Sequence, residues 1–108
     1  MVSETSESAS CAAKLSALAD PTRLAVLRVL LQGPRHVNEI NEHLSVAPNL
    51  LSHHLRILRA AGLVKSTRDG KAVTYAVAQG VGAGAERDGI YLGCCSLTFH
   101  PRSGRRKG

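Results

Sequence analysis

A single stretch near the middle of the chain, from Ala47 to Val64, constrains the fold more than any other. It reads APNLLSHHLRILRAAGLV. Leucines recur in it at four- and three-residue steps, which predicts a helix over 47–61 with one apolar face. The apolar positions are Leu51, Leu55 and Leu58. Pro48 suits the first turn of this helix, and Gly62 suits the position just after its end. The small polar and basic side chains fall away from the leucines.

A shorter helix is predicted just before this one, over 39–44, with Asn38 as its N-cap. The two helices are separated only by the short connection Ser45-Val46. Two helices joined this closely, the second with a polar exposed face, are typical of a helix-turn-helix. For the longer helix alone, an ordinary amphipathic helix that only packs is the alternative.

Beyond the longer helix the apolar period changes to two. The runs 63–68 and 71–77 flank Asp69-Gly70, a pair that strongly indicates a hairpin turn. Arg68 and Lys71 bracket this turn, and a plain two-stranded edge gives no reason for cations at its tip. A helix-turn-helix followed by a hairpin with a basic tip predicts a winged helix. The predicted fold class is therefore mainly α with a small β-hairpin.

The rest of the chain divides simply. Asp20-Pro21 predicts the start of a helix over 22–31, and Gly33-Pro34 predicts its end. We expect a disordered N-terminus over 1–8 and a disordered basic tail over 101–108. Between them, 9–100 is expected to form one DNA-binding and sensing domain.

The charge balance favours a polyanionic partner. Fourteen Lys and Arg residues against eight Asp and Glu residues give a net charge of +6. From Arg56 to Lys71, five basic side chains face a single acid, Asp69. No apolar run is long enough to cross a bilayer, and the acidic, serine-rich start is unlike a signal or transit peptide. We therefore expect a cytoplasmic protein without membrane contact, whose three cysteines are thiols.

Three segments resemble the ArsR/SmtB family of bacterial repressors. They are ALADPTRLAVLRVL at 17–30, LSHHLRILRAAGLV at 51–64 and RDGKAVTY at 68–75, and the resemblance covers roughly 12–78. It implies a homodimeric winged-helix repressor that leaves operator DNA when an inducer, often a thiophilic or transition metal, binds. It also implies that the major groove is contacted by Pro48, Asn49, Ser52, His53 and Arg56. The adjacent backbone or minor groove is then contacted by Arg68 and Lys71.

The chemistry of these side chains agrees with that assignment. Ser and Asn at a helix start can bond to base edges or phosphates, and Arg56 can pair with guanine or a phosphate. One helix and one hairpin contact few base pairs, so a two-fold dimer with its helices about 34 Å apart is expected. Neighbouring His53 and His54 diverge by about 100° on a helix and cannot chelate one ion together. We interpret His53 as a groove or phosphate contact and His54 as partly packed.

Two inducer sites common in the family are missing from this sequence. The arsenic site before the recognition helix needs cysteines, and the stretch HVNEINEH over 36–43 has none. The C-terminal zinc site needs paired Asp, Glu and His ligands at helical spacing, and Glu86, Asp88 and His100 do not form that pattern. Alternating glycines over 79–85 also interrupt any long C-terminal helix.

The cysteines offer a different site. Cys94 and Cys95 are neighbours, and a disulfide between them would be strained, so we expect thiolates that suit a soft ion. Arsenic(III) and antimony(III) favour three sulfur ligands. Helix-forming residues over 9–19 predict a first helix that carries Cys11. The resemblance implies that this helix meets the C-terminal segment at the dimer interface, which would bring Cys11 close. We therefore hypothesise that As(III) or Sb(III) is the inducer, with no cofactor permanently bound.

Three alternatives stay open. The same cysteines suit a redox or reactive-sulfur switch, for example through a bridge from Cys11 to Cys94 or Cys95. A thiol enzyme such as an arsenate reductase needs a C-x5-R phosphate loop, but the count from either paired cysteine reaches His100 or Pro101. The third is a DNA-binding protein without an inducer, in which Cys11 is simply a small buried residue. We expect no enzymatic activity.

Overall fold

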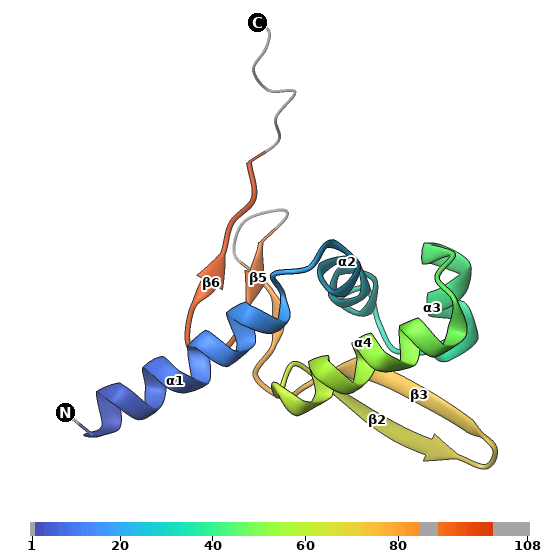
Figure 1. Cartoon of the computed structure of the whole chain (residues 1–108), viewed down its shortest axis with the longest axis horizontal. Coiled ribbons are helices and arrows are strands. Elements are labelled where there is room, and N and C mark those ends of the chain that lie inside the picture. The colour runs from blue at the N-terminus through green and yellow to red at the C-terminus, as the bar shows by residue number, and fades with distance from the viewer. Residues whose placement is uncertain (1, 85–88, 101–108) are drawn as a thin grey trace, which may run out of the picture.

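The computed structural model of the chain describes residues 2–84 and 89–100, with side chains described from Glu7 onward. Within these residues the chain forms four helices and six short strands. The helices are α1 (Val2–Ala17), α2 (Pro21–Leu30), α3 (Val37–Leu44) and α4 (Pro48–Ala60). The strands are β1 (Arg35–His36), β2 (Val64–Asp69), β3 (Ala72–Val77), β4 (Gly82–Ala83), β5 (Ile90–Tyr91) and β6 (Ser96–Leu97). Figure 1 shows the β2–β3 hairpin projecting beyond α4, and α1 near β5 and β6.

The first helix is longer than the sequence predicts. It begins at Val2, so 2–8 is helical where we expected disorder. Extending an existing helix costs far less than starting one, because each added residue gains a backbone hydrogen bond. The later turns of α1 pack on the rest of the chain through the buried Ala17, and the serine-rich residues extend that helix outward. The predicted basic tail over 101–108 lies outside the described residues.

The start of α2 confirms the prediction from Asp20-Pro21. The Asp20 carboxylate accepts hydrogen bonds from the backbone amides of Thr22 and Arg23, at 2.9 and 3.0 Å. These amides have no partner within the helix, and satisfying them is the role of an N-cap.

The start of α3 corrects a prediction. Its N-cap is His36 rather than Asn38, and the Glu39 carboxylate accepts a hydrogen bond from the His36 amide at 2.8 Å. The helix ends at Leu44 and is followed by the C-cap residue Ser45, whose backbone is left-handed with φ 54°. The Asn41 side chain then accepts a hydrogen bond from the Val46 amide at 2.8 Å. This hydrogen bond and the left-handed backbone of Ser45 shape the short turn that leads into α4.

The predicted apolar face of α4 forms the centre of the core. Leu51, Leu55 and Leu58 are each at most 1% exposed. Burying a leucine side chain stabilises a fold by about 1.5–3 kcal/mol, so this face fixes how α4 sits. The leucines pack in one cluster with buried side chains of α2, α3 and the residues that follow α4. These buried side chains include Val26, Leu27, Leu30, Ile40, Leu63 and Val64.

The predicted hairpin is present, with its turn one residue further along the chain. Asp69 pairs with Ala72, so the two turn residues are Gly70 and Lys71 rather than Asp69 and Gly70. Gly70 has φ 65°, which is the backbone that glycine supplies at the first position of a type II′ turn. The strand β1 pairs with β3, which gives a sheet of order β1-β3-β2.

The sequence left the structure of 79–100 undecided, and the described parts of it, 79–84 and 89–100, contribute a second small sheet. Its order is β4-β5-β6, with antiparallel pairing throughout. The side chains of Ile90 and Leu92 are buried and join the main core. Among the described residues, no helix is long and apolar enough to cross a membrane.

Candidate nucleic-acid interface and cysteine cluster

The polar face of α4 is exposed along its length. Pro48 is the first helical residue, as predicted. The other predicted groove residues of this helix are exposed: Asn49, Ser52, His53 and Arg56. Because the opposite face is held in the core by leucines, these side chains are presented outward from a rigid element.

His54 points the other way and anchors the helix. It is only 7% exposed, and its Nδ1 lies 3.2 Å from the Nη1 of Arg23. A guanidinium can only donate, so the Nδ1 of His54 is the acceptor in this contact. Arg23 also donates from Nε to the backbone oxygen of Ala17 at 2.6 Å. One arginine therefore joins the end of α1, the start of α2 and the inner face of α4.

Asp20 completes this junction. Its carboxylate lies 4.0 Å from the Nδ1 of His54. The hydrogen bond from the backbone amide of Arg23 lowers the pKa of Asp20 below its ordinary value of 3.8, and the nearby positive charge of Arg23 acts in the same direction. The carboxylate is therefore ionised at neutral pH.

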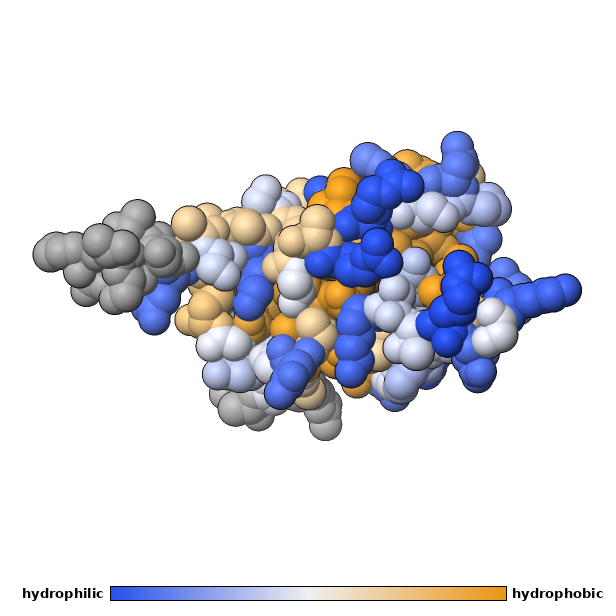
Figure 2. All heavy atoms as spheres, turned by 90° about the horizontal axis from the view of Figure 1, so that it is seen from below, coloured by the Kyte–Doolittle hydropathy of each residue, from blue (hydrophilic) through white to orange (hydrophobic). Residues whose placement is uncertain are grey.

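The hairpin packs beside the polar face of α4 and carries its cations at the tip. Arg68 and Lys71 are both exposed at the tip. Arg59 ties α4 to the hairpin, because its Nη1 donates to the Ser66 hydroxyl at 2.9 Å. A shallow hollow of about 190 Å³ lies between the two elements, lined by Ser52, Leu55, Arg56, Arg59 and Tyr75. Figure 2 shows strongly hydrophilic side chains gathered toward the hairpin end of this face.

Arg59 and Tyr75 were not among the predicted site residues. Arg59 follows Arg56 by three positions on a helix, so a spacing argument places the two on neighbouring parts of one face. Tyr75 carries no such local signal, because it reaches the hollow through strand pairing between β2 and β3.

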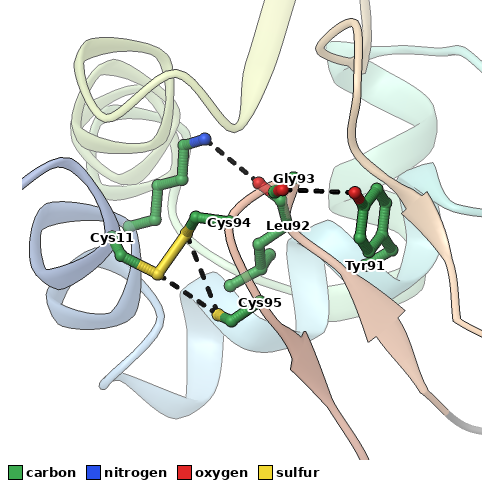
Figure 3. The surroundings of a disulfide bond; sticks show 7 residues. Cys11, Tyr91, Leu92, Gly93, Cys94 and Cys95 are labelled. Carbon is green, nitrogen blue, oxygen red and sulfur yellow. Dashed lines mark hydrogen bonds between the residues drawn. A yellow bond between two sulfur atoms is a disulfide. The ribbon is translucent and has the colours of Figure 1, made fainter. Parts of the chain in front are cut away.

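The three cysteines form one cluster within a single chain (Figure 3). Cys11 of α1 and Cys94 are joined by a disulfide, with their Cα atoms 5.9 Å apart. This corrects the expectation that all three cysteines are thiols. Cys95 is the free thiol, and its Sγ lies 3.4 Å from the Sγ of Cys11 and 3.9 Å from the Sγ of Cys94. Their closeness agrees with what the family resemblance implied for Cys11.

A tight turn between β5 and β6 explains why the neighbouring cysteines differ. Leu92 donates its amide to the Cys95 oxygen at 2.8 Å, so Gly93 and Cys94 form the turn itself. Gly93 has φ 92°, a backbone that glycine adopts readily. Cys94 is exposed at this tip, whereas Cys95 is half-buried against the core. Lys14 of α1 donates to the Leu92 oxygen at 3.0 Å and holds the turn beside α1.

The cluster suits a soft ion when it is reduced. The three Sγ atoms all lie within 4.8 Å of one another. Thiolates around a tetrahedral ion with bonds of about 2.3 Å lie about 3.8 Å apart, so only small side-chain movements are needed. In the disulfide form, Cys95 alone retains a thiol for coordination. The number of thiols in the cluster therefore depends on its oxidation state, three when reduced and one in the disulfide form.

Comparison of the chain with known proteins identifies its relatives. Residues 20–66 match the model described as "Bacterial regulatory protein, arsR family". The chain is 39% identical over 69 residues to the HTH-type transcriptional regulator NmtR of Mycobacterium tuberculosis, covering 64% of this chain and 58% of NmtR. It is 44% identical over 61 residues to a probable mercury resistance operon repressor of Streptomyces lividans, covering 56% and 49% of the two chains. The chain thus spans about half the length of these curated relatives.

A solved structure gives the same result for the fold. The homodimeric winged helix-turn-helix DNA-binding domain of Mb0332 from Mycobacterium bovis, a possible ArsR-family transcriptional regulator, matches with a TM-score of 0.65. The identity is 30%, over 68% of each chain. The winged helix-turn-helix predicted from the sequence is thereby confirmed. These relatives are regulators and not enzymes, in agreement with the expectation from sequence. The chain belongs to the ArsR family of bacterial regulatory proteins.

Proposed function

We propose that the chain is a transcriptional repressor that binds operator DNA through α4 and the β2–β3 hairpin. The observation that carries this proposal is the exposed polar face of α4 lying beside the hairpin, whose tip carries the exposed Arg68 and Lys71. The contact between Arg59 and Ser66 holds the two elements together. An exposed helix and an adjacent basic tip match the two grooves of a duplex.

The roles of the individual side chains follow from their positions. Asn49 and Ser52 lie in the first turns of α4, where a recognition helix contacts base edges or phosphates. Arg56 lies one turn further along and pairs with guanine or a phosphate. Arg68 and Lys71 bind the neighbouring phosphate backbone or minor groove. His53 supplies a further polar contact to the groove or a phosphate.

The repressor acts as a homodimer in this proposal. One α4 helix contacts only a few base pairs, and a two-fold pair spaced by about 34 Å contacts two half-sites on one side of the duplex. Leu15 on α1 is 41% exposed, which leaves an apolar side chain available for a second copy. The similar Mb0332 domain is described as homodimeric.

A soft thiophilic ion, with As(III) or Sb(III) preferred, is the proposed inducer, bound by Cys94 and Cys95 with Cys11. The three sulfurs are close enough to share one ion after reduction. The relative from Streptomyces lividans is named as a probable mercury repressor, and mercury is also thiophilic. The ion is a transient ligand and not a resident cofactor.

The structure contains a physical connection between this cluster and the DNA-binding helix. Cys11 lies on α1, and Ala17 at the end of α1 accepts a hydrogen bond from Arg23. Arg23 in turn contacts His54 on the inner face of α4. A shift of α1 on ion binding is therefore passed to α4, and a differential of a few kcal/mol between bound and released states is enough to empty an operator.

The test uses the full chain, reduced with a phosphine and bound to a duplex selected from a random-sequence library. Fluorescence anisotropy follows binding while arsenite, antimonite, cadmium or zinc is added. We expect Arg56→Ala to weaken binding by about 5- to 150-fold, the cost of one good base contact. Arg28→Gln is the matched control, because Arg28 lies on α2 against the ring of Phe99, 4.1 Å from its centroid. Equal losses in both variants would count against the assigned surface.

A second arm of the same experiment tests the ligands. A Cys94→Ser/Cys95→Ser protein is expected to bind the duplex normally and to stay bound when arsenite is added. If this protein still leaves the duplex, the cysteines are not the inducer site.

The Cys11–Cys94 disulfide favours one other candidate function, a repressor that senses oxidants or reactive sulfur. In that case peroxide or polysulfide releases the duplex and arsenite does not. The two candidates differ only in the reagent that acts on the cluster, so the same anisotropy assay separates them.

A further inference from the structure

We infer that the Cys11–Cys94 disulfide is a redox gate on the ion site, so that the oxidised protein cannot respond to the ion. This inference rests on the proposed function and concerns the regulation of the same cluster. It differs from direct oxidant sensing, because oxidation here blocks the inducer and need not release DNA.

The disulfide and the ion compete for the same sulfur atoms, and this competition is the physical basis of the gate. A soft ion is held by thiolates, and a sulfur within a disulfide is no longer a thiolate. Two of the three sulfurs of the cluster are used in the bridge, which leaves Cys95 alone. A single thiolate cannot hold an ion that requires two or three sulfur ligands. Bridge and ion therefore exclude each other.

The gate closes by an exchange that balances without other reactants. A low-molecular-weight disulfide, RSSR, accepts two electrons from the thiols of Cys11 and Cys94. The bond between the protein sulfurs forms as the S–S bond of the reagent breaks. The two thiol protons leave with the two released RSH molecules. Opening is the reverse reaction with two small thiols.

The bridge is placed where such reagents can reach it. It borders an open hollow of about 750 Å³, lined by Glu7, Ser8, Ser10, Cys11, Lys14, Gly93 and Cys94. Cys94 is exposed at the tip of its turn, so the incoming thiolate attacks its sulfur and Cys11 leaves. Cys95, whose Sγ is 3.4 Å from the Sγ of Cys11, is held ready to join both sulfurs around an ion once they are free.

The experiment measures arsenite binding directly, by equilibrium dialysis with elemental analysis, in the full-length protein before and after treatment with oxidised glutathione. Thiol titration confirms the two states, with three thiols per chain in the reduced form and one in the oxidised form. We expect oxidation to weaken arsenite binding by more than about a hundredfold, since loss even of outer-shell partners costs 10- to 100-fold. Reduction with a phosphine should restore it.

Each outcome bears on a different claim. Equal arsenite binding by both states overturns the gate and leaves the proposed function standing. Absence of binding by the reduced protein overturns the ion-responsive function and the gate together. A thiol count that stays at three after oxidation also overturns the gate. The Cys95→Ser protein is the matched control, because it keeps the bridging pair and its thiol count should fall from two to zero.

Discussion

Removal of the two cations at the hairpin tip should change how DNA binding depends on salt. Neutralising a phosphate releases counterions, and each contact contributes about 0.9 to the slope of log affinity against log salt. Arg68 and Lys71 are both exposed at the tip, so the proposed dimer would make two phosphate contacts per protomer and four in total. The Arg68→Ala/Lys71→Ala protein is therefore expected to lose about 3.6 from the slope. Between 50 and 200 mM salt, the wild type would lose about 150-fold more affinity than this variant.

Anisotropy titrations of one labelled duplex at four or five salt concentrations measure the slope. The Arg28→Gln protein is the charge control, because Arg28 lies against Phe99 on another part of the molecule. It should keep the wild-type slope. A double variant whose slope equals that of the wild type would refute the assignment of the hairpin tip to the phosphate backbone. A uniform loss of affinity with no change in slope would point to damage of the fold instead.

Three further predictions concern stability. Reduction of the Cys11–Cys94 bridge, which spans 83 positions, should lower the free energy of unfolding by about 4–5 kcal/mol in the chain-entropy account. Urea unfolding with and without a phosphine measures this, and identical midpoints would contradict it. Leu58→Ala should cost about 2–5 kcal/mol because Leu58 is fully buried, whereas Leu50→Ala at 46% exposure should change stability by less than about 0.5 kcal/mol; thermal unfolding compares the two. The pKa of Asp20 is lowered in the folded protein, so its carboxylate stabilises the fold above the ordinary value of 3.8, and that contribution is lost as the pH falls through the folded pKa. On acidification below about pH 4, the Tm of the wild type should fall more steeply than that of Asp20→Asn, and parallel curves would refute this.

The helix-turn-helix and the hairpin could be predicted because their signals are local. The spacing of Leu51, Leu55 and Leu58 defines the buried side of α4, and each of the three is buried. Asp20 caps α2 through amides two and three residues away. The hairpin turn was misplaced by one residue because Asp-Gly fits two kinds of turn. The strand register distinguishes them, because Asp69 pairs with Ala72 and leaves Gly70 and Lys71 as the turn residues.

The C-terminal sheet and the cysteine bridge could not be derived from the residues alone, because both depend on distant contacts. The glycine-rich sequence before β5 has no apolar period, and β5 is positioned by Ile90 and Leu92, which enter the main core. Cys11 and Cys94 are 83 positions apart, and no spacing rule joins them. The family resemblance implied that they come close, and the Lys14 contact to the β5–β6 turn shows how this occurs within one chain.

The division of α4 into two faces has a practical consequence for anyone who wishes to redirect the protein to another DNA target. Positions 49, 52, 53 and 56 are exposed and can be varied together in a library without disturbing the core. His54 must be left unchanged even though it stands among them in the sequence, because it belongs to the internal junction with Arg23. In the proposed function, target preference depends on the exposed face of α4 and folding on its buried face, so a library restricted to the exposed positions should yield mostly folded variants.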